Sequence, residues 1–225
     1  MPKIGTLNEK PLHASLKKWY ATSEAQFEVK TDGFVIDIVQ DNLLVEIQTG
    51  NFTSIKKKLK KLVRSHQVRL VYPITYEKWL IKLPKDGKGK STRRKSPKRG
   101  RVEELFYEMV SFPELLANPN FSIEVVMTRE EELRKYNENL NWRRRGWGIV
   151  ERHLLEVVDQ ILFEESADWL ALLPKGIEEF TTKELSDALG INRKLSQKMA
   201  YCLRKVDVIE LMGKEGRANL YRANI

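Results

Sequence analysis

Cysteine and histidine are scarce in this sequence of 225 residues, which contains one cysteine and three histidines. The lone Cys202 excludes an intrachain disulfide, and together with the dispersed His13, His66 and His153 it excludes a Cys/His zinc cluster. Low cysteine usage is typical of proteins in a reducing compartment, so we expect a cytoplasmic protein.

Long hydrophobic runs are missing as well. The sequence has no apolar stretch of about 18 residues, so we expect no transmembrane helix. The opening segment MPKIGTLNEK is too polar for a signal peptide. A membrane surface competes with nucleic acid as a partner for a basic protein, but no long basic amphipathic helix favours it.

Negative charge is in deficit, because 40 Lys and Arg residues outnumber 31 Asp and Glu residues and leave a formal net charge of +9. This excess favours a polyanionic partner, most simply DNA, with RNA as an alternative. The chain is long enough for one large or two modest domains with their own cores.

Residues 34–48, FVIDIVQDNLLVEIQ, are predicted to form a β-hairpin around which the rest of the chain is organised. Asp41-Asn42 suits the positive φ that a two-residue hairpin turn needs. That turn makes residues whose numbers sum to 83 face each other, which pairs Asp37 with Glu46. We therefore expect Asp37, Glu46 and Gln48 to share one face of the hairpin, with Val35 opposite Gln48.

Two carboxylates facing each other should destabilise a plain hairpin. A divalent cation such as Mg²⁺ would remove the repulsion, and an oxygen-rich site suits it. The alternative is that Asp37 and Glu46 are solvent-facing residues of an antiparallel sheet. Against it, every other residue of 34–39 and 43–47 is apolar, which is typical of strands buried on both faces.

A helix is predicted over residues 9–22, capped by Asn8 and tolerating Pro11 in its first turn. Its core-facing stripe should be Leu12, Leu16 and Trp19. A polar row at i, i+4 spacing contains Glu9, His13 and Lys17, and a solvated helix face is the simplest explanation for it. Residues 26–31 and the turn Asp32-Gly33 then add a strand, which makes a three-strand meander.

A basic helix is predicted over residues 53–65, with six cations between Lys56 and Arg64 and no acid. A solvated face would explain it, but the mutual repulsion of these cations favours a bound anion. Buried strands are expected at 68–73, after a crossover helix, and at 79–83.

Residues 85–101, KDGKGKSTRRKSPKRGR, contain nine cations and one acid. We expect a flexible basic loop that contacts phosphates, with a disordered solubilising insert as the alternative. Helical segments are predicted at 102–110, 113–117 and 129–136, and a strand at 121–127. The basic knot WRRRGW at 142–147 suits nucleic acid or a domain junction equally well, and the pattern of 150–163 does not separate helix from strand.

The last part of the chain has a different pattern. A short helix at 167–173, a capping box at Thr181–Glu184, a stop at Gly190 and a second helix over 193–205 precede a predicted hairpin. In the second helix Leu195, Met199, Cys202 and Leu203 should point inward. This order is that of a winged helix, which could contact DNA or mediate protein contacts only.

The residues we expect to contact nucleic acid are Lys56, Lys57, Lys60, Arg93, Arg94, Lys95, Lys98, Arg99, Arg143, Arg144, Arg193, Lys194 and Lys198. The predicted domains are 1–128 with its basic loop at 85–101, a connecting region at 129–166, and a winged-helix-like domain at 167–225. A homodimer is one assembly that the sequence allows.

Asp37 followed by Glu46-Ile47-Gln48 across a hairpin, after a helix with Glu9, resembles the PD-(D/E)XK nuclease superfamily. The resemblance covers roughly residues 5–85 and implies a restriction endonuclease-like α/β fold, a mixed sheet flanked by helices. It also implies Asp37 and Glu46 as ligands of Mg²⁺ or Mn²⁺, with Glu9 as a supporting ligand. Gln48 stands where the family usually has Lys, and some restriction-type members have Gln there.

We therefore expect a Mg²⁺-dependent DNA endonuclease targeted by the C-terminal domain. Asp37, Glu46 and Glu9 would hold the metal, Gln48 would orient a water, and His13 or Lys17 could assist. Two alternatives are a non-catalytic DNA-binding regulator on a nuclease scaffold and an RNA-binding or RNA-processing protein.

Overall fold

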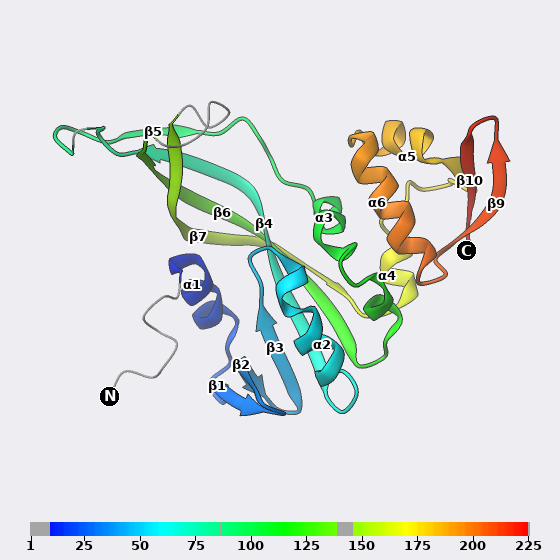
Figure 1. The fold of residues 1–225 in the computed structure, drawn as a ribbon, viewed down its shortest axis with the longest axis horizontal. Coiled ribbons are helices and arrows are strands. Elements are labelled where there is room, and N and C mark those ends of the chain that lie inside the picture. Colours follow the sequence, from blue (N-terminus) through cyan, green and yellow to red (C-terminus); the bar gives the residue numbers. More distant parts are fainter. Residues whose placement is uncertain (1–9, 86, 139–145, 225) are drawn as a thin grey trace.

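The computed structural model describes residues 10–85, 87–138 and 146–224, which form a seven-stranded mixed sheet and a small three-stranded antiparallel sheet, both with helices (Figure 1). The predicted α/β class, a mixed sheet flanked by helices plus a small C-terminal unit, is confirmed at this level. None of the helices in these ranges combines the length and hydropathy that a membrane crossing needs.

The large sheet has the strand order β1-β2-β3-β4-β6-β7, and β5 also pairs with β4. Its strands are β1 (Gln26–Thr31), β2 (Phe34–Gln40), β3 (Leu43–Ile47), β4 (Gln67–Lys82), β5 (Thr92–Lys95), β6 (Phe121–Tyr136) and β7 (Trp147–Phe163). The helices of this part are α1 (Pro11–Tyr20), α2 (Lys56–Leu62) and α3 (Phe106–Met109), with the 3₁₀ turns η2 (Phe52–Ile55), η3 (Val102–Leu105) and η4 (Pro113–Ala117).

The predicted meander of β1, β2 and β3 is confirmed. Asp32 and Gly33 adopt positive φ in the first turn and Asp41 does so in the second, as tight hairpin turns require. Beyond β3, the chain crosses through α2 and returns as β4, which pairs parallel to β3. The crossover helix and the buried strand after it are therefore confirmed.

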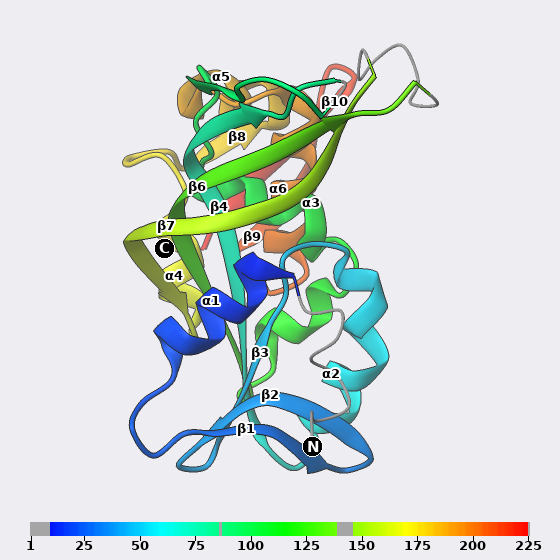
Figure 2. The ribbon, with the colours of Figure 1, turned by 90° about the vertical axis from the view of Figure 1, so that its left-hand side faces the viewer.

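Helices α1 and α2 cover opposite faces of the meander, on either side of β3 (Figures 1 and 2). Leu12 and Leu16 of α1 pack against one set of strand residues, Ile38, Val45, Ile47, Val71 and Val126. The apolar side of α2 joins the larger core on the other face. Trp19, predicted to complete the α1 stripe, is 40% exposed, so that prediction is wrong. The next residue, Tyr20, points inward instead and donates to Glu124 at 2.6 Å.

Strand β4 is one continuous strand of 16 residues, although two separate strands were predicted. Its last residues, Trp79–Lys82, pair antiparallel with β5. The basic segment 85–101 thus contains a strand and is not simply a flexible loop.

Residues 129–166 do not form a connecting region. The helix predicted at 129–136 is the second half of β6, and the unassigned residues 150–163 belong to β7, which completes the sheet. Cross-strand ion pairs hold this charged part: Glu130 with Arg152 at 2.7 Å, and Glu132 with Lys78 at 2.7 Å. The large sheet therefore extends to the end of β7.

The C-terminal unit consists of α4 (Ser166–Leu170), β8 (Glu179–Thr181), α5 (Thr182–Leu189), α6 (Arg193–Arg204), β9 (Ile209–Glu215) and β10 (Ala218–Ala223), with the sheet order β8-β10-β9. The predicted capping box opens α5, and Gly190 ends it in the left-handed conformation. The four inward positions predicted for α6 are all buried. Trp169 of α4 stacks on Phe163 of β7 at 4.3 Å, so the two sheets share one continuous core.

Candidate functional site at the hairpin carboxylates

The candidate site lies where the hydrogen-bonded ladders around β2 are interrupted. The predicted register between β2 and β3 is confirmed from Gln40↔Leu43 to Ile38↔Val45, and there the ladder ends. On the other side of β2, the ladder to β1 skips Asp37 as well. Glu28, the β1 residue at the skipped position, has a φ of +55°, which is costly for a residue with a side chain. Backbone strain of this kind clusters at functional sites.

Asp37 fills the gap between the separated strands. Its Oδ2 accepts a hydrogen bond from the backbone N–H of Ile47 at 2.9 Å and lies 3.2 Å from Nε2 of His13. Burial opposes the charged carboxylate, but the hydrogen bond and charge of His13, the Ile47 amide and the charge of Lys17 together lower the pKa of Asp37. Asp37 is therefore ionised at neutral pH.

Glu46 is 5% exposed and lies beside Asp37, whose backbone N–H is 3.4 Å from Glu46 Oε1. Burial and the charge of Asp37 raise the pKa of Glu46 to about 7, although the ammonium of Lys58 on α2 forms a close ion pair with it. The two carboxylates are thus adjacent, as predicted, but they are not a ladder pair. Asp37 contacts α1, whereas Glu46 contacts α2.

Lys58 is the residue of this site that the sequence does not single out. Six cations occur between Lys56 and Arg64, and only the helical phase of α2 could have indicated which of them faces β3. Lys58 also donates to the Val35 carbonyl at 2.5 Å, so it spans β2 and β3 over the gap between them.

Gln48 does not share the face of the carboxylates. Its side-chain amide donates to the Gly50 and Asn51 carbonyls and to Ser54 Oγ. Since these bonds hold the loop between β3 and η2, the expected role of Gln48 in orienting a water is not supported. The predicted pairing of Gln48 with Val35 is absent from the β2–β3 ladder of the described residues.

The polar row of α1 faces the hairpin and is not a solvated surface. His13 contacts Asp37, and the buried Lys17 lies 3.3 Å from Glu28. Glu9, expected as a supporting metal ligand, lies outside the described residues. Within the described ranges, His, Cys, Asp and Glu do not gather in any group of three or more that could hold a metal ion. A metal here would have two carboxylates as its described protein ligands.

Comparison with known proteins places the chain in a family. Residues 10–164 match the model of a domain of unknown function, DUF8091. The chain belongs to the DUF8091 family. An uncharacterized protein of Treponema pallidum (strain Nichols) is 30% identical over 222 residues, which cover 97% of this chain and 87% of that protein. No solved structure matches at a significant level.

The DUF8091 segment ends within one residue of the end of β7 at Phe163, so it coincides with the large sheet and its helices. The carboxylate pair and Lys58 lie inside this segment. The C-terminal unit, from α4 onward, lies outside it.

Several predicted nucleic-acid contacts of the DUF8091 segment are already paired with acids. On α2, Lys60 forms a close ion pair with Glu114, and Lys56 lies 3.9 Å from the same carboxylate, whereas Lys57 is exposed. Glu114 of η4 therefore supplies a counterion to two cations of the basic helix, although the helix itself contains no acid.

The cations of β5 and the connector after it are paired in the same way. The pairs are Arg93 with Glu131, Lys95 and Arg99 with Glu77, and Lys98 with Glu104. Arg94 is exposed and forms no ion pair with any described residue. Arg143 and Arg144 lie outside the described residues.

Outside the DUF8091 segment, α6 has a basic surface. Arg193 and Lys194 are exposed and Lys198 is half-buried, and none of the three pairs with an acid among the described residues. Tyr201, one or two turns further along, is 43% exposed. Cations beside an accessible aromatic ring suit contact with nucleic acid.

Proposed function

We propose that this protein is a Mg²⁺-dependent DNA endonuclease whose site is built by Asp37, Glu46 and Lys58. The observation that carries the proposal is the meeting of the half-buried Asp37 carboxylate, the buried Glu46 carboxylate and the Lys58 ammonium at a break in the β2–β3 ladder. Acidic oxygens and one ammonium group are what phosphodiester hydrolysis with a divalent cation needs.

The order of elements supports the same conclusion. A helix, a three-strand antiparallel meander, a crossover helix and a strand parallel to the third strand follow one another in the chain. This order resembles the core of the PD-(D/E)XK superfamily, so we propose a restriction endonuclease-like fold for the DUF8091 segment. Lys58 then takes the place of the lysine that is missing at Gln48.

The carboxylates fit Mg²⁺ by their donor atoms. Mg²⁺ is commonly bound through one or two carboxylates, with waters and substrate phosphates completing its octahedron. Among the described residues, Oδ1 of Asp37 and Oε2 of Glu46 accept no hydrogen bond, so each carboxylate keeps an oxygen for a ligand. A bound cation would supply charge for the phosphate and make a nearby water more acidic.

The protein's own residues would position the groups. His13 and the Ile47 amide fix the orientation of Asp37. Lys58 Nζ would exchange part of its ion pair with Glu46 for a hydrogen bond to a phosphate oxygen. It would then stabilise the negative charge that develops on that oxygen. Gln48 would hold the loop after β3 without touching the substrate.

The C-terminal unit would bring the site to DNA. Its order, α4, β8, α5, α6 and the β9–β10 hairpin, is that of a winged helix, and α6 would be the helix that contacts DNA through Arg193, Lys194 and Lys198. The basic charge of these residues supports phosphate contact.

A non-catalytic DNA-binding regulator is the second candidate. The ion pair of Lys58 with Glu46 favours it, because the chain already supplies a cation to the carboxylate pair. On this alternative the nuclease scaffold binds DNA and cuts nothing.

A nuclease assay separates the two. Supercoiled, linear duplex and single-stranded DNA, and a structured RNA, would be incubated with Mg²⁺ or Mn²⁺. We expect cleavage of DNA that disappears in Asp37→Asn. The matched control is Asp32→Asn, since Asp32 is also paired with a histidine, His66 at 3.0 Å, but lies in the β1–β2 turn. Binding of DNA without metal-dependent cleavage would establish the regulator, and cleavage of RNA alone would overturn both.

A further inference from the structure

A notch interrupts the edge of β4 between two of its partners. Strand β6 pairs with nearly the full length of β4 on one side, so β3 and β5 share the other side. There, β3 pairs with residues 67–71 and β5 with residues 79–82, which leaves 72–78 without a strand partner in the described chain. Pro73 falls in this interval, and it has no N–H to give to a ladder.

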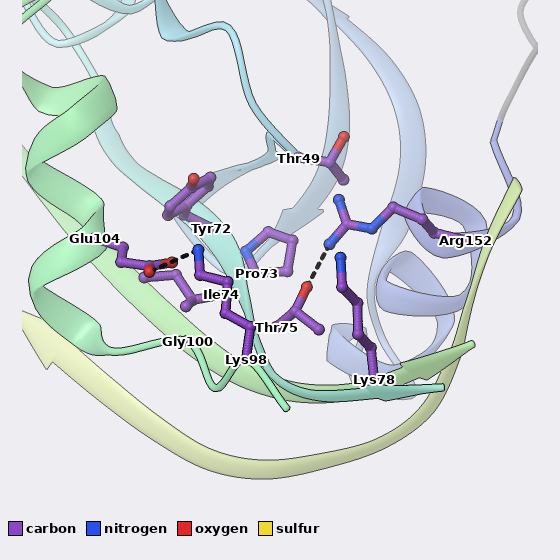
Figure 3. Close-up of a pocket in the computed structure, with 10 residues that line it drawn as sticks. All are labelled: Thr49, Tyr72, Pro73, Ile74, Thr75, Lys78, Lys98, Gly100, Glu104 and Arg152. Carbon is purple, nitrogen blue, oxygen red and sulfur yellow. Dashed lines mark hydrogen bonds and ion pairs between the residues drawn. The ribbon is translucent and has the colours of Figure 1, made fainter. Parts of the chain in front are cut away.

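A hollow of about 160 Å³ opens at this notch, walled by Thr49 after β3 and by the connector after β5 (Figure 3). Gly100 of the connector donates to the Thr75 carbonyl at 3.0 Å. A Cβ on Gly100 would lie 2.4 Å from that carbonyl oxygen, so only glycine allows this approach. The volume is many times the roughly 10–15 Å³ that a cavity needs to hold one water.

Arg152 reaches the hollow from β7 and is held there by a buried acid. Its Nε and Nη2 bind the two oxygens of Glu130, which is fully buried, at 2.7 and 2.9 Å. Nη2 also donates to Thr75 Oγ1 at 2.8 Å. The remaining nitrogen, Nη1, makes no hydrogen bond within the described residues and faces the hollow in Figure 3.

Lys78 lies beside Arg152, and both charged groups point into the hollow (Figure 3). Glu132 takes one of the three Lys78 donors at 2.7 Å, which leaves two for a ligand. Across the hollow, Lys98 is 3.0 Å from Glu104. Two cations held side by side with donors to spare suit an anion with several acceptor oxygens, such as phosphate, because both would donate charge-assisted hydrogen bonds to it.

We propose that this notch binds a phosphate group of the nucleic-acid strand that Asp37 and Glu46 act on. The proposal rests on the proposed function. The notch would add a second contact that fixes the position of the nucleic-acid strand. Thr49 is three residues beyond Glu46, so their Cα atoms are at most about 11 Å apart. At roughly 3.4 Å per nucleotide, the wall of the hollow at Thr49 therefore lies within the length of about three nucleotides from Glu46.

The test measures phosphate binding directly. Inorganic phosphate would be titrated into the full-length protein, without metal, and followed by NMR and calorimetry. We expect Lys78→Gln and Arg152→Lys each to weaken phosphate binding about 10-fold, the typical loss of one charge-assisted hydrogen bond. Lys78→Arg should restore binding, and the control Lys175→Gln, an exposed cation of the C-terminal unit, should leave it unchanged. Melting curves verify that each variant is folded.

A competition identifies the source of the phosphate. Saturating single-stranded DNA should displace inorganic phosphate from the parent protein and from Asp37→Asn alike. Equal phosphate affinity in the parent and in folded Lys78→Gln would overturn the proposal, as would phosphate binding that DNA leaves undiminished. Because no arm of this test requires cleavage, its outcomes can be interpreted even when the protein proves not to be an endonuclease.

Discussion

Glu46 is the residue whose charge state should report on the site. Its pKa is raised from 4.5 to about 7 by burial and by Asp37, so the folded protein holds this proton more firmly than the unfolded chain does. Stability from this group is fully present below pH 4.5 and is lost as the pH rises through 7. Asp37, whose pKa is lowered, acts in the opposite direction and only below its ordinary value of 3.8.

In the metal-free protein, Glu46→Gln should therefore flatten the dependence of stability on pH between 4.5 and 7. At pH 8 we expect the variant to be more stable than the parent by roughly 1–3 kcal/mol, the order of magnitude of such a shift. Urea denaturation at a series of pH values measures this. Parallel stability curves for the parent and the variant would show that Glu46 is not buried against a second carboxylate.

Lys58→Gln tests the proposal that Lys58 takes the place of the lysine missing at position 48. If Lys58 stabilises charge on the reacting phosphate, its loss should lower kcat about 100-fold, as for other donors aimed at a developing anion. DNA affinity should change little. The neighbouring exposed residue provides the control, Lys57→Gln, which should keep the parent kcat. Equal loss in both variants would assign the effect to overall charge.

Sequence reasoning found Asp37 and Glu46 because each is a lone charge in an apolar strand, which is a local signal. It did not find Lys58 because the choice among neighbouring lysines depends on where α2 packs. It placed Gln48 in the site by assuming a regular hairpin, and the ladder ends three residues earlier, at Val45.

At the scale of elements, β6 shows where local propensity fails. Residues 129–136, REEELRKY, are good helix formers, yet they form a strand whose charges pair across β4 and β7. The capping box at Thr181 was predictable because all its partners lie within three residues. The pairing of β6 with β7 depends on contacts distant in sequence, which no local pattern contains.

Glu130→Gln should therefore destabilise the protein through the β6–β7 pair. Glu130 is fully buried and binds Arg152, Thr75 and Thr128, so removing its charge leaves a cation without its counterion. We expect a loss of about 3 kcal/mol in the free energy of unfolding.

Its neighbour supplies the control. Glu131 pairs with Arg93 at the surface, so Glu131→Gln should cost less than about 1 kcal/mol. Chemical denaturation compares the two, and similar small losses would mean that the buried network contributes nothing beyond a surface pair.

For the whole molecule, the proposed binding of DNA should depend on salt through the predicted contacts that lack an acidic partner. Among the predicted contacts these are Lys57, Arg94, Arg193, Lys194 and Lys198, while the others described are paired within the chain. Five phosphate contacts give a slope of about −4.5 for log K against log salt.

Equilibrium binding of duplex DNA between low and moderate salt measures that slope. Arg94→Gln and Lys194→Gln should each reduce it by about one and weaken all sequences alike, since phosphate contacts carry no base information. A slope weaker than about −2 would mean that these cations are a solvated surface.

The length of β4 sets the distance between the two places at which the protein would contact the proposed duplex DNA. Leu70 stands level with Glu46, and Lys82, twelve residues later, stands where β5 pairs. At about 3.3 Å per residue this separation is no more than roughly 40 Å, close to one helical turn of B-DNA. Strand β4 would fix the spacing of the two contacts. Hydroxyl-radical footprints should therefore show two protected patches on one side of the duplex, about one turn apart.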